Sequence, residues 1–346
     1  MTRPAVEFDR VSIVFGDRPR SALDLMDEGR GRAEIQETTG QVLGVHDCSL
    51  TVAQGEILVL MGLSGSGKST LLRAVNGLNP VVRGEVRIDG GDGMVSVTRA
   101  KRRTLRRLRQ ARVSMVFQQF GLLPWRRVRE NVGLGLELSG MGIHARNEVV
   151  DRQLALVGLT DWADRKVAEL SGGMQQRVGL ARAFATDAPI LLMDEPFSAL
   201  DPLIRTRLQD ELLDLQARLR RTIVFVSHDL DEAFKLGGRI AIMEGGRIVQ
   251  CGTPAEIFTR PANDYVADFV VNMNPLGVLT AGDIARAGEG SGEAIPASMP
   301  VRDLMRLCAM RGEAIPVQDG GRTIGVVDRA AVLSRLARPS GAGQPG

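Results

Sequence analysis

The segment Gly62–Thr70, with the sequence GLSGSGKST, combines the residue types that bind phosphate groups. It follows the apolar run Ile57–Met61 and precedes a helical pattern, so a strand, a tight turn and a helix are expected. Glycines let backbone N–H groups point inward at an anion, and the helix N-terminus adds partial positive charge. A purely structural glycine turn is the alternative, but the flanking strand and helix argue against it. The residues expected to surround the phosphates of a nucleotide are Gly62, Ser64, Gly65, Ser66, Gly67, Lys68, Ser69 and Thr70.

Four polar residues are expected at the ends of buried strands. Asp194 and Glu195 end the apolar run that begins at Ile190, Gln118 ends another, and His228 follows a third. We expect Asp194, Ser69 and Gln118 to hold Mg²⁺, with Lys68 reaching the β- and γ-phosphates. Glu195 would polarise the attacking water, with His228 beside the γ-phosphate and Gln118 sensing both water and metal. Each residue alone is more often structural, so this interpretation depends on the phosphate loop.

A second possible anion site begins at Leu170, in the sequence LSGGMQQR. Ser171 and the amides of Gly172 and Gly173 open a predicted helix that also contains Gln175. One nucleotide does not need two such cradles from the same chain. We therefore expect a head-to-tail pair, in which the second cradle of each chain covers the nucleotide of the other.

These residues have to be positioned by alternating strands and helices. Apolar runs at Val113–Gln118, Ile190–Asp194 and Thr222–Ser227 predict buried strands, and Pro202–Arg220 predicts a long amphipathic helix. The alternation predicts an α/β sheet with crossover connections. A closing hairpin is expected around Glu244-Gly245-Gly246.

The composition limits the class of protein. The 346 residues are 44% hydrophobic and 25% charged, which is ordinary for a globular protein, and the net charge of +3 does not indicate a nucleic-acid partner. The basic stretch Arg99–Arg112 contains no aromatic residue, so a solvated helix face or a surface near anionic headgroups is favoured. Three dispersed cysteines, Cys48, Cys251 and Cys308, favour a reducing compartment.

Together with Ser198–Asp201 (SALD), the motifs resemble the ATP-binding-cassette family over about Val6 to Cys251. The resemblance implies an α/β ABC-type nucleotide-binding domain: a P-loop NTPase core with a helical subdomain and N-terminal β elements. It implies ATP hydrolysis with Mg²⁺, and adenine stacking on Phe15, where Tyr is more usual. Ser171 and Gly173 would contact the γ-phosphate in trans, Asp201 would lie in the dimer-facing loop, and His228 would be the switch.

The family resemblance also implies a membrane partner. The segment Gln119–Asn131 is more apolar than a solvated loop, so the cytoplasmic helix of a permease is expected to dock there. The N-terminus contains no signal-peptide pattern, and no apolar run reaches the roughly 18 residues of a membrane span. A peripheral position on the cytoplasmic face of a bacterial inner membrane is expected, with a periplasmic or extracellular solute-binding protein as an indirect partner and no nucleic acid.

A finer resemblance concerns the transported solute. The insertion 17–40, Leu63, and Phe197–Arg205 resemble importers of quaternary amines, namely glycine betaine, proline and choline, and Asn76–Gly84 and Phe120–Arg126 look most like the choline member. An ATPase subunit does not touch the solute, so no residue here selects it. An importer of another small solute, a soluble non-transport ABC ATPase, and a regulatory module without turnover are the alternatives. Glu195 and His228 argue against the last.

The chain is expected to divide into several parts. These are an ATP-binding domain at 1–275, a linker at 276–298, a small α/β appendage at 299–338, and a disordered tail at 339–346. The appendage, with Ile324–Asp328, resembles one half of the tandem CBS pair that glycine-betaine ATPases often carry. A single half has an incomplete ligand cleft, so a regulatory role and a dimer-stabilising remnant both stay open.

Overall fold

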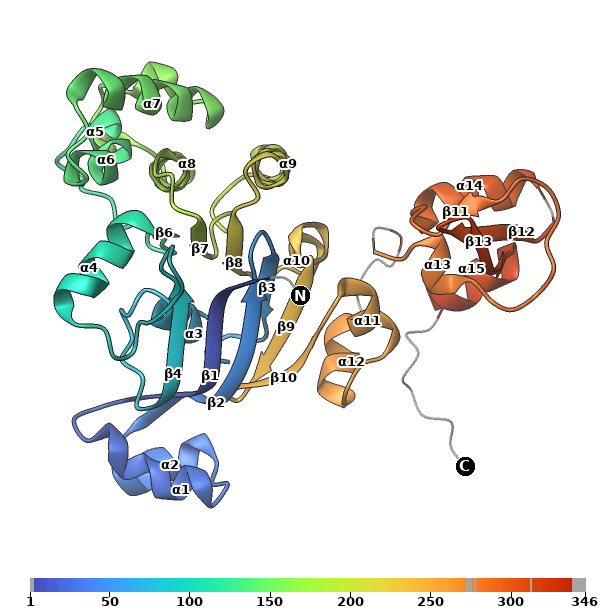
Figure 1. The fold of residues 1–346 in the computed structure, drawn as a ribbon, viewed down its shortest axis with the longest axis horizontal. Helices are drawn as coiled ribbons and strands as arrows, with labels where there is room; N and C mark the ends of the chain where they lie inside the picture. Colours follow the sequence, from blue (N-terminus) through green and yellow to red (C-terminus); the bar gives the residue numbers. More distant parts are fainter. Residues whose placement is uncertain (1–2, 272–275, 277, 312, 338–346) are drawn as a thin grey trace. The chain divides into compact units, whose positions relative to one another are not determined.

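The computed structural model describes residues 3–271, 276, 278–311 and 313–337 of the chain (Figure 1). These form two compact units. The first comprises Met1–His228 with Met243–Ile248, and the second comprises Asp229–Ile242 with Val249–Gly346. The tail predicted at 339–346 lies outside the described residues. Across the described part of the chain, no helix is both long and apolar enough to span a bilayer.

The first unit begins with an antiparallel sheet in the order β2-β1-β4-β5. Its strands are β1 (Pro4–Phe15), β2 (Val42–Ala53), β4 (Arg83–Asp89) and β5 (Met94–Ser96). In β1, Val6, Phe8, Val11 and Ile13 are buried, as the apolar alternation predicts. This sheet corresponds to the N-terminal β elements expected from the family resemblance.

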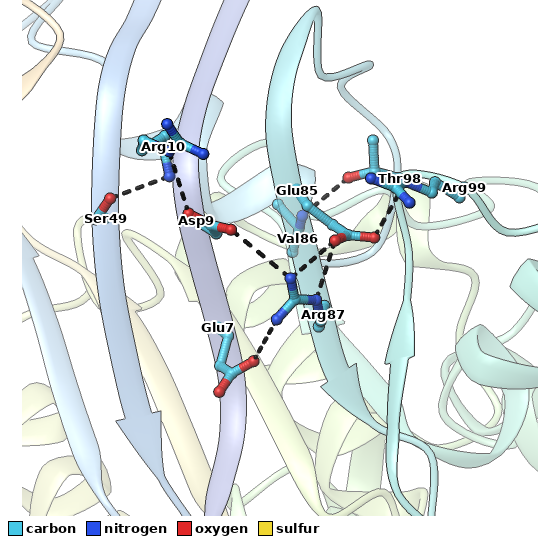
Figure 2. A network of polar contacts seen from close by, with 9 residues as sticks. All are labelled: Glu7, Asp9, Arg10, Ser49, Glu85, Val86, Arg87, Thr98 and Arg99. Carbon is cyan, nitrogen blue, oxygen red and sulfur yellow. Dashed lines mark hydrogen bonds and ion pairs between the residues drawn. The ribbon is translucent and has the colours of Figure 1, made fainter.

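A network of charged side chains links β1, β4 and the segment after β5 on one face of this sheet (Figure 2). Arg87 contacts Glu85 at 2.9 Å, Glu7 at 3.3 Å and Asp9 at 3.7 Å, and Arg99 contacts Glu85 at 3.3 Å. Hydrogen bonds from Ser96 and Arg87 lower the pKa of Glu85. Exposed pairs of this kind contribute little stability each, but several around one guanidinium fix the register of neighbouring strands.

Four parallel strands form the second layer of this unit, in the order β3-β8-β7-β6. They are β3 (Ile57–Met61), β8 (Thr222–Val226), β7 (Ile190–Asp194) and β6 (Val113–Val116). Every residue of β3, β7 and β8 is buried, which explains why their sequences are continuous apolar runs. The carboxyl ends of parallel strands meet at one edge, and the predicted site residues follow these ends.

Helices that follow the phosphate loop connect and cover these strands. They are α3 (Lys68–Ala74), α4 (Arg102–Ala111), α5 (Val128–Val132), α6 (Leu134–Leu138), α7 (Ile143–Leu156), α8 (Gly172–Ala185) and α9 (Pro202–Leu219). Helices α5, α6 and α7 gather against α8 (Figure 1), as the helical subdomain predicted from the family resemblance requires. The α/β fold class predicted from the sequence is confirmed.

The insertion 17–40 has a small core of its own. It forms a 3-10 helix (Pro19–Ala22), α1 (Leu23–Asp27) and α2 (Arg32–Thr39). Met26 and Ile35 are buried in one cluster with Ala22, Val14 and Leu43. The insertion is therefore a folded layer on β1 and β2. The weak helical spacing in the sequence does not reveal this folded layer, because only three buried residues of the insertion are enough to pack its short helices.

The second unit contains α10 (Leu230–Leu236), α11 (Pro254–Thr259), α12 (Asp264–Val270) and a small α/β segment. The segment consists of α13 (Ala281–Ile284), β11 (Ile295–Pro296), α14 (Val301–Met310), β12 (Ile315–Asp319), β13 (Arg322–Val327) and α15 (Arg329–Ala337). In its sheet, β12 pairs in parallel with β11 and antiparallel with β13. The Gly- and Ala-rich stretch expected to be a linker contains α13 and β11, with Ala281, Ile284 and Ile295 buried. Composition does not reveal such short elements.

The hairpin of β9 (Arg239–Glu244) and β10 (Arg247–Gly252) turns at Gly245 and Gly246, as predicted. Both glycines have positive φ, 55° and 87°, which is the backbone that a tight two-residue turn requires.

Candidate nucleotide-binding site

A cavity of about 640 Å³ in the first unit brings together most of the predicted site residues. Its walls come from β1, the insertion helix α2, β2, the phosphate loop and the segments that follow β6, β7 and β8. The lining residues are Phe15, Arg32, Gln36, Val42, Leu43, Gly44, Ser64, Gly65, Gly67, Lys68, Ser69, Thr70, Gln118, Glu195 and His228. The cavity thus brings the phosphate loop together with the aromatic Phe15 and with the three polar residues Gln118, Glu195 and His228.

Two glycines of the phosphate loop are required by sterics. Gly62 has φ 140°, and a Cβ there would lie 2.1 Å from the carbonyl oxygen of Met243. Gly67 has φ 101°, and its Cβ would lie 2.6 Å from the carbonyl oxygen of Gly44. Any larger residue at either position would displace backbone, so the loop folds this tightly only with glycine.

Lys68 lies folded back on its own loop. Its Nζ donates to the carbonyl oxygens of Gly62 and Leu63, at 2.8 Å each, and lies 3.4 Å from Oγ of Ser66. Burial lowers the pKa of Lys68, against the opposing effect of Glu195 and Asp194. The ammonium group therefore bonds neutral oxygens in this structure. Hydrogen bonds from an ammonium to an anionic phosphate are stronger, so a bound phosphate would replace these oxygens favourably.

Asp194 is fully buried at the end of β7 and has two partners from α3. Its Oδ1 accepts from the Ser69 hydroxyl at 2.6 Å, and its Oδ2 accepts from Arg73 Nη2 at 2.8 Å. A hydroxyl and a carboxylate at this distance are oxygen ligands of the kind that Mg²⁺ prefers. Sequence reasoning missed Arg73, although it follows Ser69 by four residues and so lies on the same face of the helix.

Glu195, Gln118 and His228 converge on one point of the cavity. Glu195 Oε2 is 3.3 Å from Gln118 Nε2 and 3.4 Å from His228 Nδ1. Glu195 also has φ 48°, in the left-handed region that few residues other than glycine occupy. Such strain gathers at functional sites, and here it directs a carboxylate toward the phosphate loop. Hydrogen bonds also hold the loop: the Glu195 N–H donates to Val226 O, and Gln176 Nε2 donates to Glu195 O.

Phe15 and Thr70 line the cavity near Gly44. A Cβ on Gly44 would lie 2.9 Å from the Phe15 ring and 3.1 Å from the Thr70 methyl, so glycine leaves room for both. Two residues expected around the phosphates, Gly62 and Ser66, are buried beneath the loop and do not line the cavity. They shape the loop through its backbone.

The second cradle lies away from this cavity. Ser171 caps α8 by accepting from the N–H of Met174 at 3.4 Å, while Gly172 and Ser171 are exposed. Gln175 donates to the carbonyl oxygen of Leu170, and Asp201 caps α9 by accepting from the N–H of Ile204. None of these lines the cavity. Within one chain, therefore, the lining of the cavity includes none of Ser171, Gly172, Gly173, Gln175 and Asp201.

Gln176 connects α8 to the loop after β7 and was missed by sequence reasoning. It is buried, its Nε2 donates to the Glu195 carbonyl at 3.1 Å, and its Oε1 accepts from the N–H of Ala199 at 3.0 Å. One side-chain amide on α8 is thereby bonded to the backbone of the loop that carries Glu195.

An apolar groove of about 300 Å³ lies beside the helical subdomain. Leu78, Phe117, Gly121, Leu134 and Leu138 are among the residues that line it. Leu78 and Leu138 are 46% and 61% exposed. Of the segment Gln119–Asn131, for which the sequence predicts docking, only Gly121 lines this groove. Trp125, in the same segment, is 69% exposed outside it.

Comparison with known proteins identifies relatives. A family model described as ABC transporter matches residues 45–198. The chain is 50% identical over 281 residues to the glycine betaine/proline betaine transport system ATP-binding protein ProV of Escherichia coli (strain K12), covering 81% of this chain and 69% of that one. It is 44% identical to the trimethylamine N-oxide transport system ATP-binding protein TmoW of Ruegeria pomeroyi, covering 98% and 99%.

A solved structure is also similar. The ATP-binding cassette MJ0796, described as dimeric in a post-hydrolysis state bound to ADP and Pi, matches with a TM-score of 0.62 and 29% identity. The match covers 72% of this chain and 98% of that chain.

Proposed function

The chain belongs to the ATP-binding-cassette transporter ATPase family, and from that premise we propose that it is the ATP-hydrolysing subunit of an importer for methylated amines. Relatives are described as serving glycine betaine, proline betaine, carnitine and trimethylamine N-oxide. These solutes share a nitrogen carrying several methyl groups. Glycine betaine is accordingly the first candidate here, and choline, toward which the sequence motifs alone point, is the second.

The meeting of Lys68, Glu195 and His228 in one cavity is the observation that carries ATP hydrolysis, and the solute is argued from the relatives alone. The phosphate loop would hold the triphosphate, and Phe15 would stack on adenine. Glu195 Oε2 would accept a proton from water as the water oxygen attacks the γ-phosphorus, and the bond to the β-phosphate oxygen would break. Lys68 and His228 would stabilise the charge on the phosphoryl oxygens. Ser69, Asp194 and Gln118 would hold Mg²⁺, which would supply positive charge to offset that of the phosphates.

A second copy of the chain would complete the site. Ser171, Gly172 and Gly173 open α8, a helix of 14 residues, and line no part of the ATP cavity of their own chain. Exposed N–H groups at a helix start bind anions, so a γ-phosphate presented by the partner is a suitable ligand. The described dimer of MJ0796 supports this arrangement. Asp201 would lie at the interface.

A permease would occupy the groove beside α6. The groove offers exposed Leu78 and Leu138 next to the cationic Arg109 and Arg182. A short amphipathic helix with an apolar face and an acidic end fits this chemistry. The docking surface proposed here therefore includes Phe117 and Gly121, and moves from the predicted Gln119–Asn131 toward α6. Such a contact would place the chain on the cytoplasmic face of the membrane, with a solute-binding protein reached only through the permease.

We retain the predicted division of the chain as part of the proposal. An ATP-binding domain would occupy 1–275, with the appendage 299–338 as a single CBS-like unit. Its elements follow one another in the order α14, β12, β13 and α15.

Uptake in cells tests the solute. A strain lacking the gene should lose uptake of radiolabelled glycine betaine and regain it with the wild-type gene, but not with the Glu195→Gln form. Competition with unlabelled choline and trimethylamine N-oxide ranks the solutes. Unchanged uptake of glycine betaine in the deletion strain, and of choline and trimethylamine N-oxide labelled in the same way, would exclude the methylated-amine proposal while leaving ATP hydrolysis to be measured on the purified protein.

A further inference from the structure

Helix α2 of the insertion supplies two residues to the nucleotide cavity that the family motifs do not include. Arg32 and Gln36 line the cavity together with the phosphate loop and Phe15. They are four residues apart on α2 and therefore lie on one helical face. The buried Ile35, packed with Met26 and Leu43, anchors this helix on β1 and β2. Both side chains are thus presented from a fixed element.

Arg32 is bonded directly to the phosphate loop. Its Nη1 donates to the carbonyl oxygen of Gly65 at 2.6 Å, and its Nη2 donates to the carbonyl oxygen of Gly44 at 2.5 Å. One guanidinium thereby joins the loop to β2. Glycine at position 246 leaves the space for it, because a Cβ there would lie 2.6 Å from Arg32 Nη2.

The charge of Arg32 has no carboxylate partner among the residues that the structure describes. Both of its bonded partners are neutral carbonyls, and its buried Nε has no hydrogen-bond partner in the described part of the chain. Burial lowers the pKa of Arg32. A partly desolvated cation with an unused donor, beside a loop shaped for phosphates, is an environment that an anionic ligand would stabilise.

We propose that Arg32 is a positioning residue that fixes the phosphate loop for the triphosphate, and that Gln36 contacts the base or sugar end of the nucleotide. This inference rests on the proposed function, because it assumes that ATP is the ligand of the cavity. The insertion thereby becomes a wall of the ATP site. Loss of Arg32 frees the Gly65 peptide and removes a positive charge, so affinity for any triphosphate falls. Loss of Gln36 affects only ligands that carry a nucleoside.

Equilibrium binding of two probes to the purified full chain tests both roles. The probes are Mg²⁺-ATP and inorganic tripolyphosphate with Mg²⁺. For Arg32→Ala we expect both dissociation constants to rise about tenfold, which corresponds to about 1.4 kcal/mol. For Gln36→Ala we expect a rise of several-fold for ATP and no change for tripolyphosphate.

Two further variants separate positioning from general stability. Arg30→Ala is the matched control, because Arg30 is exposed in the same insertion and its ion pairs among the described residues are with Glu28 and Glu34. Its dissociation constants should stay within twofold of the wild type. Arg32→Lys keeps the charge but offers a single donor group, so its affinity should fall between those of the wild type and Arg32→Ala. Arg32→Lys no better than Arg32→Ala would contradict the role of the charge.

The outcomes also separate this inference from the function on which it rests. If the wild-type protein binds ATP and Arg32→Ala binds both probes equally well, the positioning role is wrong and the ATPase proposal stands. If Arg32→Ala lowers the melting temperature but leaves both dissociation constants unchanged, Arg32 only stabilises the fold, and the positioning role is again wrong. If the wild type itself binds neither probe, the ATPase proposal fails.

Discussion

The hydroxyl of Ser69 donates a hydrogen bond to the buried carboxylate of Asp194 at 2.6 Å, joining the phosphate loop to the end of β7. Arg73 bonds the other carboxylate oxygen at 2.8 Å. These contacts give each carboxylate oxygen of Asp194 a partner, and they put the hydroxyl and the carboxylate in position to share one cation. The phosphate loop and the end of β7 are thus joined directly through one carboxylate.

Replacing Arg73 by alanine should destabilise the protein most when nucleotide is absent. The fully buried Asp194 would lose a charged partner, at a cost of about 1–3 kcal/mol in the free energy of unfolding. Mg²⁺-ATP would supply positive charge at the same carboxylate, so the difference from the wild type should shrink when Mg²⁺-ATP is saturating. Urea unfolding with and without Mg²⁺-ATP measures this. Arg106→Ala, an exposed arginine of α4, is the control; equal losses in both conditions would contradict the shared role of Asp194.

Glu195→Gln should abolish ATP turnover while ATP still binds. The amide keeps the shape of the side chain and can bond Gln118, but it cannot accept a proton from water at neutral pH. We expect the turnover rate to fall at least about 100-fold, within the usual contribution of a general base. Phosphate release and ATP binding are measured on the same preparation, with Glu289→Gln in the second unit as the control. Turnover at the wild-type rate would mean that another group accepts the proton.

The residues around Glu195 show what the sequence could and could not predict. Apolar runs predicted the buried strands, and the strand ends correctly brought Gln118, Glu195 and His228 to one cavity. Arg32 and Gln36 could not be placed, because nothing in the sequence of the insertion 17–40 indicates that it folds back against the loop at Gly65. That contact is set by tertiary packing of Ile35, which has no sequence signature beyond a single apolar residue.

The buried thiol of Cys48 should make stability fall at high pH. Burial raises the pKa of Cys48 to about 11, from an ordinary value of 9.0. Between these values the unfolded chain has released the thiol proton and the folded chain has not, so the free energy of unfolding falls as pH rises. Two pKa units correspond to about 2.7 kcal/mol. Unfolding by urea from pH 8 to 11 should show this decline in the wild type and in Cys251→Ala. If the free energy of unfolding of Cys48→Ala falls with pH as steeply as that of the wild type, groups other than Cys48 cause the decline.

Two inactive variants should restore each other if the active site forms between chains. Lys68→Ala removes the cation of the phosphate loop, and Ser171→Arg places a large side chain at the exposed start of α8, outside the cavity of its own chain. Each variant alone should lack turnover, because both sites of its dimer contain a defect. A mixed dimer, however, has one site built from the intact loop of the Ser171→Arg chain and the intact cradle of the Lys68→Ala chain.

Mixing the two purified variants in equal amounts, with the permease present, should therefore give about a quarter of the wild-type turnover. Half of the dimers would be mixed under random association, and each would carry one working site out of two, provided that the sites turn over independently. Lys68→Ala mixed with Glu195→Gln is the control, since both defects lie in the cavity of one chain and leave every site with a damaged half. A site shared between chains would be contradicted if turnover recovers in that control mixture, or if it does not recover when Lys68→Ala is mixed with Ser171→Arg. Recovery of turnover in the Lys68→Ala and Ser171→Arg mixture, and in no other, would show that Ser171 acts at the ATP cavity of the partner chain.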